Sequence, residues 1–412
     1  MNGSKGSTDI AIIGGGMVGL SLALLLARRA PALGICLIEA FDLDRQPSVE
    51  MPPSFDARST ALAESAREIY QRIGLWHSLE AHICPIKTIH VSDRSHMGAT
   101  RMSADETGVD SLGYVVENRR LGEVLIDAAR TEHNIALISP AKAKGLTPVA
   151  GGMKVQLDAI DVPVEAKLAV VADGANSQTL QQLGIHTRIE NYGQTALIAN
   201  LALAEPHNGV AYERFTDEGP MALLPLQDVD GEHRSALVWT LPPARAETLR
   251  SGPENQFLDE VHRRLGFRAG SFIRRGKCDA YPLALMVAEE QVRSHLAVVG
   301  NAAHFLHPVA GQGFNLALRD VAKLAQVLIE AVKGGKNPGD LSVLERYIDY
   351  QGRDQAATIG FSHSLPSIFG RKGIPEKIAR NAGLIALDLI PPARQEFARF
   401  GAGLFNSAAK IR

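Results

Sequence analysis

Short apolar runs that end in glycine turns recur along the chain and set its expected elements. Residues 9–13 form the first run, which ends in Gly14, Gly15 and Gly16 and is followed by the apolar segment 19–27. This order predicts a buried strand, a tight turn and a buried helix. Three further buried strands are predicted over residues 35–38, 168–172 and 296–299.

Other stretches of the chain have a helical or an alternating pattern. Helices are predicted over residues 56–72 and 120–132, and again after residue 311, where Phe314, Leu318, Val321, Leu324 and Leu328 recur at helical spacing. Between residues 195 and 241 the pattern alternates and turn residues interrupt it, which predicts an antiparallel sheet. Its expected strands cover residues 197–203, 210–215, 222–226 and 236–241.

The expected fold class is α/β, with two interleaved domains in 412 residues. A Rossmann-like domain, with a mixed or parallel sheet covered by helices, is assembled from residues 7–76, 110–190 and 285–335. An antiparallel-sheet domain from residues 77–109 and 191–284 is inserted into it as the substrate domain. Residues 336–412 are expected to form a helical C-terminal region.

Composition excludes several classes of protein. The apolar fraction of 45% and charged fraction of 21% are typical of an ordered globular chain, and the net charge of −2 gives no reason to expect nucleic acid as a partner. Cys36, Cys84 and Cys278 lack metal-ligand or redox spacing, so neither a disulfide framework nor a zinc site is expected. Because no secretion signal and no apolar run of about 18 residues is present, the expected compartment is the cytoplasm.

The first glycine turn carries a recognisable dinucleotide-binding pattern. Gly14, Gly16 and Gly19 have the spacing that permits a tight turn, close approach to a pyrophosphate, and close packing of helix on strand. Glu39 follows 20 residues after the last glycine, at the distance of an acid that accepts hydrogen bonds from ribose hydroxyls. Glycine-rich turns also occur for purely structural reasons, but this one follows a strand and opens a helix. The segment predicts dinucleotide binding without separating FAD from NAD.

A second glycine turn lies near the other end of the chain. The segment 299–315 reads VGNAAHFLHPVAGQGFN and leads from a strand, through a turn, to a helix that begins near Gly311 and Gly313. Helix N-termini expose unpaired N–H groups, which suit the pyrimidine edge of a flavin. Two distant turns of this kind fit one long cofactor, which favours FAD.

These two motifs are part of a wider resemblance. The sequence resembles the class A flavoprotein aromatic hydroxylases, and within them the ubiquinone-biosynthesis hydroxylases of the 2-polyprenyl-6-methoxyphenol branch. The resemblance spans residues 9–405. Besides the glycine turns it rests on strings in a characteristic order: FDARSTAL (55–62), VVENRRL (115–121), VADGANS (171–177), YGQTAL (192–197) and HPVAGQGFNLALRD (307–320).

The resemblance implies a role for each matching residue. Arg58 would reach the FAD pyrophosphate and the incoming nicotinamide nucleotide, a position that suits a guanidinium. Asn118 would contact FAD, Asp173 with Gly174 would serve both FAD and NAD(P)H, and Asn301 would hold the ribityl chain. The residues expected to lie against the flavin ring are Pro308, Gly311, Gln312, Gly313, Phe314 and Asn315.

Two positions depart from the family pattern. Most of the wider family has aspartate where this chain has Asn301, although asparagine is itself typical of the polyprenyl-methoxyphenol branch. The DGANS string is followed by Leu180 where arginine is usual, which weakens the expectation that this segment binds NAD(P)H.

The activity implied by the resemblance is hydroxylation of a polyprenylated methoxyphenol in ubiquinone biosynthesis, with NADPH or NADH and O2, through a flavin hydroperoxide. Alternatives are a hydroxylase of another ring position of a ubiquinone precursor, or of a small soluble phenol with arginine or tyrosines in its pocket. More distant alternatives are an FAD oxidase and a non-catalytic FAD-fold protein that binds lipid. The sequence identifies no catalytic base.

For several other residues we expect a structural role rather than a catalytic one. His304 and His307 have no acidic or cysteine partner nearby in the sequence, so structural hydrogen bonding is expected and a metal site is not. Arg319 and Asp320 are expected to be solvent or packing partners, and Trp76 and Trp239 to be core residues. The C-terminal stretch combines an apolar side with cations such as Lys372 and Arg380, which raises the hypothesis of a surface for the membrane or for other ubiquinone-biosynthesis enzymes.

Overall fold

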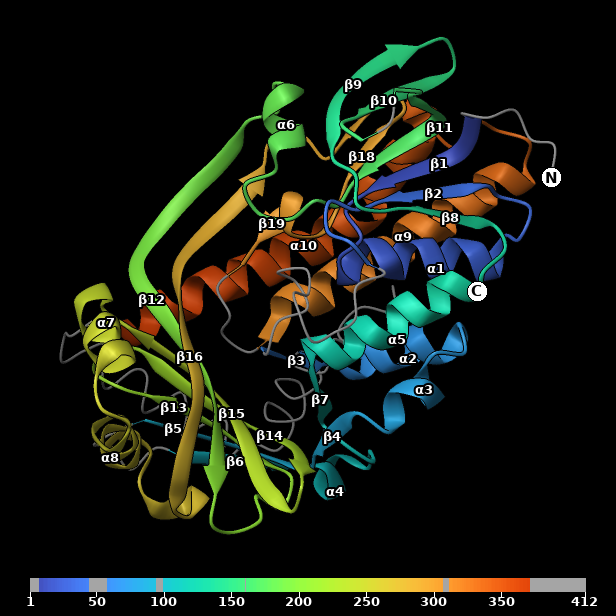
Figure 1. Cartoon of the computed structure of the whole chain (residues 1–412). Coiled ribbons are helices and arrows are strands. Elements are labelled where there is room, and N and C mark those ends of the chain that lie inside the picture. The colour runs from blue at the N-terminus through green and yellow to red at the C-terminus, as the bar shows by residue number, and fades with distance from the viewer. Residues whose placement is uncertain (1–6, 44–57, 94–98, 160, 307–310, 371–412) are drawn as a thin grey trace.

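Within the described residues, the strands form two eight-stranded sheets and one small three-stranded sheet. The computed structural model describes residues 7–43, 58–93, 99–159, 161–306 and 311–370. Figure 1 shows the first sheet beside the long helices and the second sheet below it. The α/β fold class expected from the sequence is confirmed.

The first sheet has five parallel strands at its centre: β18 (Leu296–Val298), β11 (Val164–Val171), β1 (Ser7–Ile13), β2 (Ile35–Ile38) and β8 (Ile135–Ile138). Three antiparallel strands, β9 (Ala143–Val149), β10 (Gly152–Leu157) and β17 (Val292–Arg293), complete it. The central strands are almost continuously apolar because helices and chain cover both faces of a parallel sheet.

Helices from distant parts of the chain pack together beside this sheet: α1 (Met17–Arg29), α2 (Glu64–Arg72), α3 (Trp76–Glu80), α5 (Asn118–Thr131), α9 (Gln312–Lys333) and α10 (Leu341–Gly370). α1 is buried along nearly its whole length, which explains its uniformly apolar sequence. The apolar side of α9 predicted from the sequence joins the same core, as does Trp76, 7% exposed.

The helix predicted over residues 56–72 is wrong in its first part. Residues 56 and 57 lie outside the described residues, and Ser59–Leu62 form a strand, β3, before α2 begins at Glu64. β3 pairs antiparallel with β7 (Gly113–Glu117), which also pairs with β4 (Ile83–Ile86). A pairing between segments more than 50 residues apart overrides the local helical preference.

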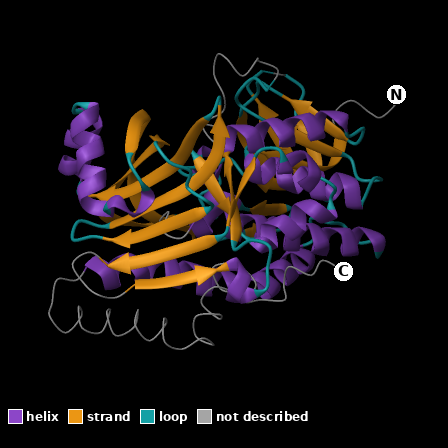
Figure 2. Ribbon diagram, turned by 90° about the horizontal axis from the view of Figure 1, so that it is seen from below, coloured by secondary structure: helices purple, strands orange, loops and turns teal. Residues whose placement is uncertain are grey.

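The second sheet contains β5 (Thr88–Asp93), β6 (Ala99–Ser103), β12 (Thr187–Leu203), β13 (Val210–Phe215), β14 (Pro220–Val229), β15 (Glu232–Leu241), β16 (Phe272–Ala288) and β19 (His304–Phe305). Its pairs are antiparallel, as predicted, except β5 with β13, which is parallel. The 17-residue strands β12 and β16 arch from the first sheet to the second (Figure 1). Seen from below, the strands of the second sheet lie side by side with helices along their edges (Figure 2).

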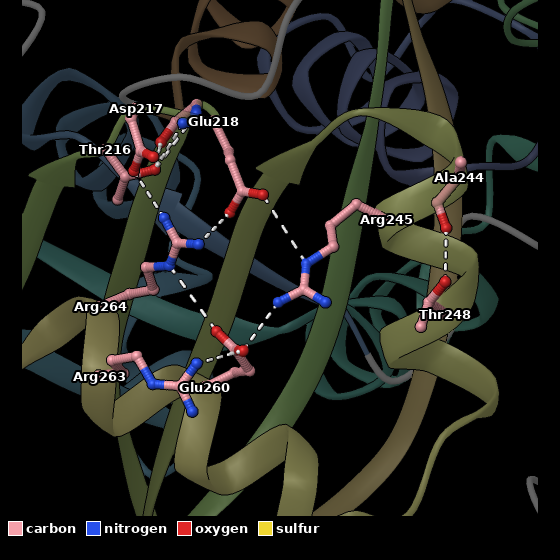
Figure 3. Close-up of polar contacts among 10 residues, drawn as sticks. Thr216, Asp217, Glu218, Ala244, Arg245, Thr248, Glu260, Arg263 and Arg264 are labelled. Carbon is pink, nitrogen blue, oxygen red and sulfur yellow. Dashed lines mark hydrogen bonds and ion pairs between the residues drawn. The ribbon is translucent and has the colours of Figure 1, made fainter.

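One face of the second sheet is closed by α7 (Pro243–Ser251) and α8 (Glu254–Leu265), whose apolar side chains pack against Trp239, a core residue as predicted. Ion pairs fasten the two helices in place (Figure 3). Arg264 contacts Asp217 at 2.6 Å and Glu218 at 2.7 Å, and Arg245 contacts Glu260 at 2.8 Å. The opposite face packs in part on β4 and β7, together with the short helix α4 (Ala104–Thr107).

Candidate functional site

Four predicted cofactor positions meet at one edge of the first sheet. Gly14, Glu39, Asp173 and Asn301 follow the carboxyl ends of β1, β2, β11 and β18, which are adjacent parallel strands. In open α/β sheets this edge is where ligands bind. Residues spread over nearly 300 positions of sequence are therefore brought to one place.

The first glycine turn is closely packed against its surroundings. Gly14 has a φ of +110°, and a Cβ there would lie 2.4 Å from the carbonyl oxygen of Ala172. A Cβ on Gly19 would lie 1.9 Å from the carbonyl oxygen of Gly14. Both positions require glycine, the first for its backbone conformation and the second for the close approach of α1 to the turn.

Glu39 is held against the same turn. It is 7% exposed, and its Oε2 accepts a hydrogen bond of 2.6 Å from the backbone N–H of Gly15, while Oε1 accepts one from Phe41. Burial raises the pKa of this carboxyl, against the lowering effect of the backbone hydrogen bonds. Each carboxylate oxygen has a further lone pair, so Glu39 can still accept hydrogen bonds from ribose hydroxyls.

The two carboxylate oxygens of Asp173 differ in their hydrogen bonding. Its Oδ2 accepts a hydrogen bond of 2.8 Å from Thr179, whereas its buried Oδ1 has no hydrogen-bond partner among the described residues. The neighbouring Gly174 has a φ of +91°, and nothing lies within 4 Å of where its Cβ would be. The free oxygen and the open space fit an additional hydrogen-bonded group at this position.

Gly300 and Asn301 form a short turn, η3 (Gly300–Ala302), beside the first glycine turn. A Cβ on Gly300 would lie 3.1 Å from the side chain of Val18 in α1, and the φ of Gly300 is +66°. The side chain of Asn301 is exposed, which leaves its amide available to a ligand.

The remaining predicted residues gather around β3 and the start of α9. Gly311, with a φ of +60°, precedes α9, and Gln312 and Asn315 in its first turn are each 2% exposed. The amide of Asn315 donates to the carbonyl oxygens of Ala61 and Gly311 and accepts from the N–H of Ala63. Asn315 therefore fixes the start of α9 against β3.

Arg58 and Asn118 lie at the other end of β3. The N–H of Asn118 donates to the carbonyl oxygen of Arg58 at 2.8 Å, and its Oδ1 accepts from Thr60 at 2.6 Å. The guanidinium carbon of Arg58 lies 4.7 Å from the centre of the Tyr281 ring in β16. Arg58 therefore connects the three-stranded sheet of β3, β7 and β4 with the second sheet.

Two features test whether a long anionic cofactor fits these residues. Within the described residues, neither α1 nor α9 has a side-chain cap or an acidic residue in its first turn, an arrangement that suits an anion at a helix N-terminus. Nothing lies within 4 Å of the Cβ position of Gly313. The donors and the open space suit a pyrophosphate at α1 and a flavin ring at α9. Pro308 lies outside the described residues.

A cavity of about 230 Å³ adjoins this arrangement. Arg58 lines it on one side, and Ile198, Asn200 and Asp279 line it from β12 and β16. Arg234, also in the lining, makes a two-pronged ion pair with Glu117, the residue before α5. Residues of the second sheet, together with Arg58 beside β3, thus surround this space.

The sequence missed one polar pair. His304 has an acidic partner, contrary to expectation: its Nε2 lies 2.5 Å from Oδ2 of Asp320, and both side chains are fully buried. Asp320 lies 16 residues further along the chain, in α9, and the fold brings it to His304 in β19. Arg319 and Asp320 are both packing partners rather than solvated residues, since Arg319 is paired with Asp354 in α10. His307 lies outside the described residues.

Within the part of the chain that the structure describes, no three His, Cys, Asp or Glu side chains are grouped to hold a metal ion. None of the described helices is both long and apolar enough to span a bilayer.

The fold and this site define a flavoprotein of the two-sheet, FAD-binding type, and the comparisons with known proteins give its family. The chain belongs to the FAD binding domain family, whose model matches residues 7–349, and it is an FAD-dependent monooxygenase. It is 33% identical to the ubiquinone hydroxylase UbiL of Rhodospirillum rubrum, over 96% of this chain and 89% of that protein. It is 31% identical to the 3-demethoxyubiquinol 3-hydroxylase of Escherichia coli, over 96% of this chain and 99% of that protein.

A solved structure has the same fold over nearly its full length. The p-nitrophenol 4-monooxygenase PnpA of Pseudomonas putida DLL-E4 aligns with a TM-score of 0.78 at 15% identity, covering 98% of this chain and 99% of that chain. The family resemblance expected from the sequence and FAD as the cofactor are confirmed.

Proposed function

We propose that this chain hydroxylates the ring of a polyprenylated methoxyphenol in ubiquinone biosynthesis. The observation that carries the proposal is the identity of 33% with the ubiquinone hydroxylase UbiL, sustained over 96% of this chain. The reaction consumes one phenol, one O2, one NAD(P)H and one proton, and yields the dihydroxylated ring, NAD(P)+ and water. When bound, FAD would supply the redox chemistry that couples oxidation of NAD(P)H to the transfer of one oxygen atom from O2 to the ring.

The residues of the chain then have distinct tasks. Gly14, Gly16 and Gly19 let the FAD pyrophosphate approach the start of α1. The carboxylate of Glu39 accepts hydrogen bonds from the ribose hydroxyls. The guanidinium of Arg58 provides a fixed positive charge for phosphate groups. Asp173 and Asn301 offer hydrogen-bond partners to the polar chain of FAD between its ends.

The flavin ring is assigned to the segment from Gly311 to Asn315 at the start of α9. Gly313 leaves room for the ring, and the helix N-terminus favours the negative charge that collects on the pyrimidine portion after reduction. Beside that space, Asn118 holds the start of α5 against β3, and Asn315 holds the start of α9 against β3. The second sheet provides the substrate-binding part.

Deletion of the gene, followed by identification of the quinone precursor that accumulates, tests the proposal. Accumulation of a 2-polyprenyl-6-methoxyphenol is expected. An intermediate lacking a different ring hydroxyl would favour another ring position, for which the 31% identity with 3-demethoxyubiquinol 3-hydroxylase is the supporting observation. An unchanged quinone pool overturns the proposal, and loss of growth on a small phenolic acid instead would support a soluble-phenol hydroxylase.

A polyprenylated substrate also requires access to a membrane, and the C-terminal stretch is the proposed contact. Its residues from 371 on lie outside the described residues, so the proposal rests on the apolar and cationic residues of the sequence alone. Vesicles containing anionic phospholipid should co-sediment with the full chain and less with a K372E/R380E variant. Equal binding of both proteins would remove this proposal.

A further inference from the structure

A row of directly paired residues crosses the second sheet. Val91 pairs with Glu213, Glu213 with Ala222, Ala222 with Val238, Val238 with Ile198, and Ile198 with Asp279. Direct partners in neighbouring strands place their side chains on the same face. These residues alternate along the strands with those that pack on α7 and α8, so the row lies on the opposite face of the sheet.

All of this row except Val91 is partly accessible: Glu213, Ala222, Val238, Ile198 and Asp279 are half-buried. The next residues on the same face of β13 and β15 are buried, namely Ala211 at 4%, Phe215 at 6%, Ala236 at 2% and Thr240 at 2% exposure. On β12, β14 and β16 some of these neighbours are half-buried, and Lys277 is exposed. The five half-buried residues form a continuous accessible strip, which we call the Glu213 strip.

One end of the Glu213 strip reaches the candidate cofactor site. Ile198 and Asp279 line the cavity that Arg58 lines from the other side. From Ile198 to Glu213 the strip crosses three strand intervals, about 14 Å at the usual spacing of strands. That length accommodates an aromatic ring between the cavity and Glu213.

Glu213 stands at the far end in apolar surroundings. Val91 and Ala222 flank it across the strands, and Ala211 and Phe215 flank it along β13. Within the described part of the chain no hydrogen-bond donor or cation contacts its carboxyl group, and burial alone raises its pKa to about 8. Glu213 nevertheless keeps some accessible surface on this face of the sheet.

We propose that Glu213 accepts the proton of the ring hydroxyl of a neutral phenol that lies along the Glu213 strip. The inference rests on the proposed hydroxylase function and names the catalytic base that the sequence did not identify. The O–H bond of the phenol breaks, its proton passes to a carboxylate oxygen of Glu213, and the electron pair stays on the ring oxygen. The ring becomes more electron-rich, which favours oxygen transfer to it, and no additional oxidant is involved.

The same residue selects among phenols. Above its pKa of about 8, Glu213 is a carboxylate, which repels the carboxylate of a phenolic acid bound beside it and accepts a hydrogen bond from a neutral phenol. Ala222 and Val238 provide a flat apolar floor for the ring. The Glu213 strip therefore favours a prenylated phenol over the small phenolic acids of the nearest alternative.

The test uses full-length protein with bound FAD, NADPH, and a 2-methoxyphenol that carries one isoprene unit as the probe. Hydroxylated product is measured for the wild-type chain, Glu213→Gln and Glu213→Asp on both sides of the pKa of about 8. We expect the wild-type kcat to rise with pH through this value, because the carboxylate is the active form. Glu213→Gln should lose about 100-fold in kcat and its pH dependence, whereas Glu213→Asp should keep part of both.

Two further variants make the test decisive. Asp230→Asn removes an exposed carboxylate from the β14–β15 turn of the same sheet and should behave like the wild type. Ala222→Val adds bulk beside Glu213 and should raise KM while leaving the flavin content and pH profile unchanged. If Glu213→Gln loses its flavin, an unchanged KM in Ala222→Val overturns the inference.

The outcomes separate this inference from the proposed function. Product from the wild-type chain together with an unchanged rate and pH profile in Glu213→Gln overturns the role of Glu213 and leaves the hydroxylase function intact. A flavin-loaded wild-type chain that oxidises NADPH without forming any hydroxylated ring contradicts the proposed function itself.

Discussion

At the residue scale, two glycines of the candidate site have opposite steric environments. A Cβ at Gly19 would meet the carbonyl oxygen of Gly14 at 1.9 Å, so Gly19 is required by the fold. A Cβ at Gly313 would meet nothing within 4 Å, although Gly313 lies in the interior of a helical first turn where glycine is unfavourable. The cost of glycine at position 313 is explained if its free space is filled by the flavin.

Replacement of Gly313 by alanine is therefore expected to spare the fold and weaken cofactor binding. The added methyl group enters the space assigned to the flavin and should raise the Kd for FAD at least tenfold, about 1.4 kcal/mol. Fluorescence titration of the apoprotein with FAD measures it. Gly352→Ala, in α10 and equally free of contacts, is the control and should leave the Kd unchanged. Unaltered affinity in Gly313→Ala would place the flavin elsewhere.

At the element scale, the position of α9 depends on contacts with distant segments. Asn315 ties its first turn to β3, His304 lies against Asp320 in its middle, and Arg319 reaches α10. The Arg319 guanidinium, 5% exposed, contacts Asp354 at 2.7 Å. These contacts fix the N-terminus of α9 relative to β3, where the cofactor ring is assigned.

Breaking the buried Arg319–Asp354 ion pair between α9 and α10 should lower the stability of the fold substantially. Asp354→Ala leaves the buried Arg319 charge unpaired and is expected to lower the free energy of unfolding by about 3–5 kcal/mol, measured by urea denaturation. The double variant Arg319→Met with Asp354→Leu should recover most of that loss.

An exposed ion pair between the same two helices supplies the control. Glu330 and Arg346 lie 2.8 Å apart with side chains 44% and 42% exposed. Glu330→Ala should therefore cost at most about 1 kcal/mol. If Glu330→Ala and Asp354→Ala lowered the free energy of unfolding by similar amounts, burial would not explain the cost of breaking the Arg319–Asp354 pair.

At the scale of the whole molecule, the candidate cofactor residues join segments from Gly14 to Asn315. A ligand that binds this assembled site and not the unfolded chain stabilises the fold by mass action. FAD bound at the proposed site would therefore link the first sheet, β3 and α9, none of which forms the site alone. Cofactor content and thermal stability should be coupled.

The Tm of the apoprotein should rise with FAD concentration. At 100 times the Kd the expected stabilisation is about 2.7 kcal/mol, and differential scanning fluorimetry follows it. FMN, which lacks the adenosine portion, should give a smaller rise because the turn at Gly14 and the carboxylate of Glu39 stay unused. Equal shifts with FAD and FMN would contradict the assignment of that end of the site, and no shift with either would contradict cofactor-coupled stability.

The sequence by itself determined the features that depend on neighbours along the chain. Apolar runs located β1, β2, β11 and β18, and the spacing from Gly19 to Glu39 indicated a dinucleotide site, because a strand–turn–helix unit is specified within about 30 residues. The alternating pattern between residues 195 and 241 likewise predicted four strands of the second sheet, β12, β13, β14 and β15.

Only the tertiary structure decided which distant residues share a face or a pair. The β3 strand, the parallel pairing of β5 with β13, the His304–Asp320 contact and the Glu213 strip all depend on partners far away in the sequence. A local pattern states that a side chain faces inward or outward, but register and packing decide what it meets. For this reason the sequence alone could not identify Glu213 as a candidate base; the neighbouring strands of the folded sheet were needed.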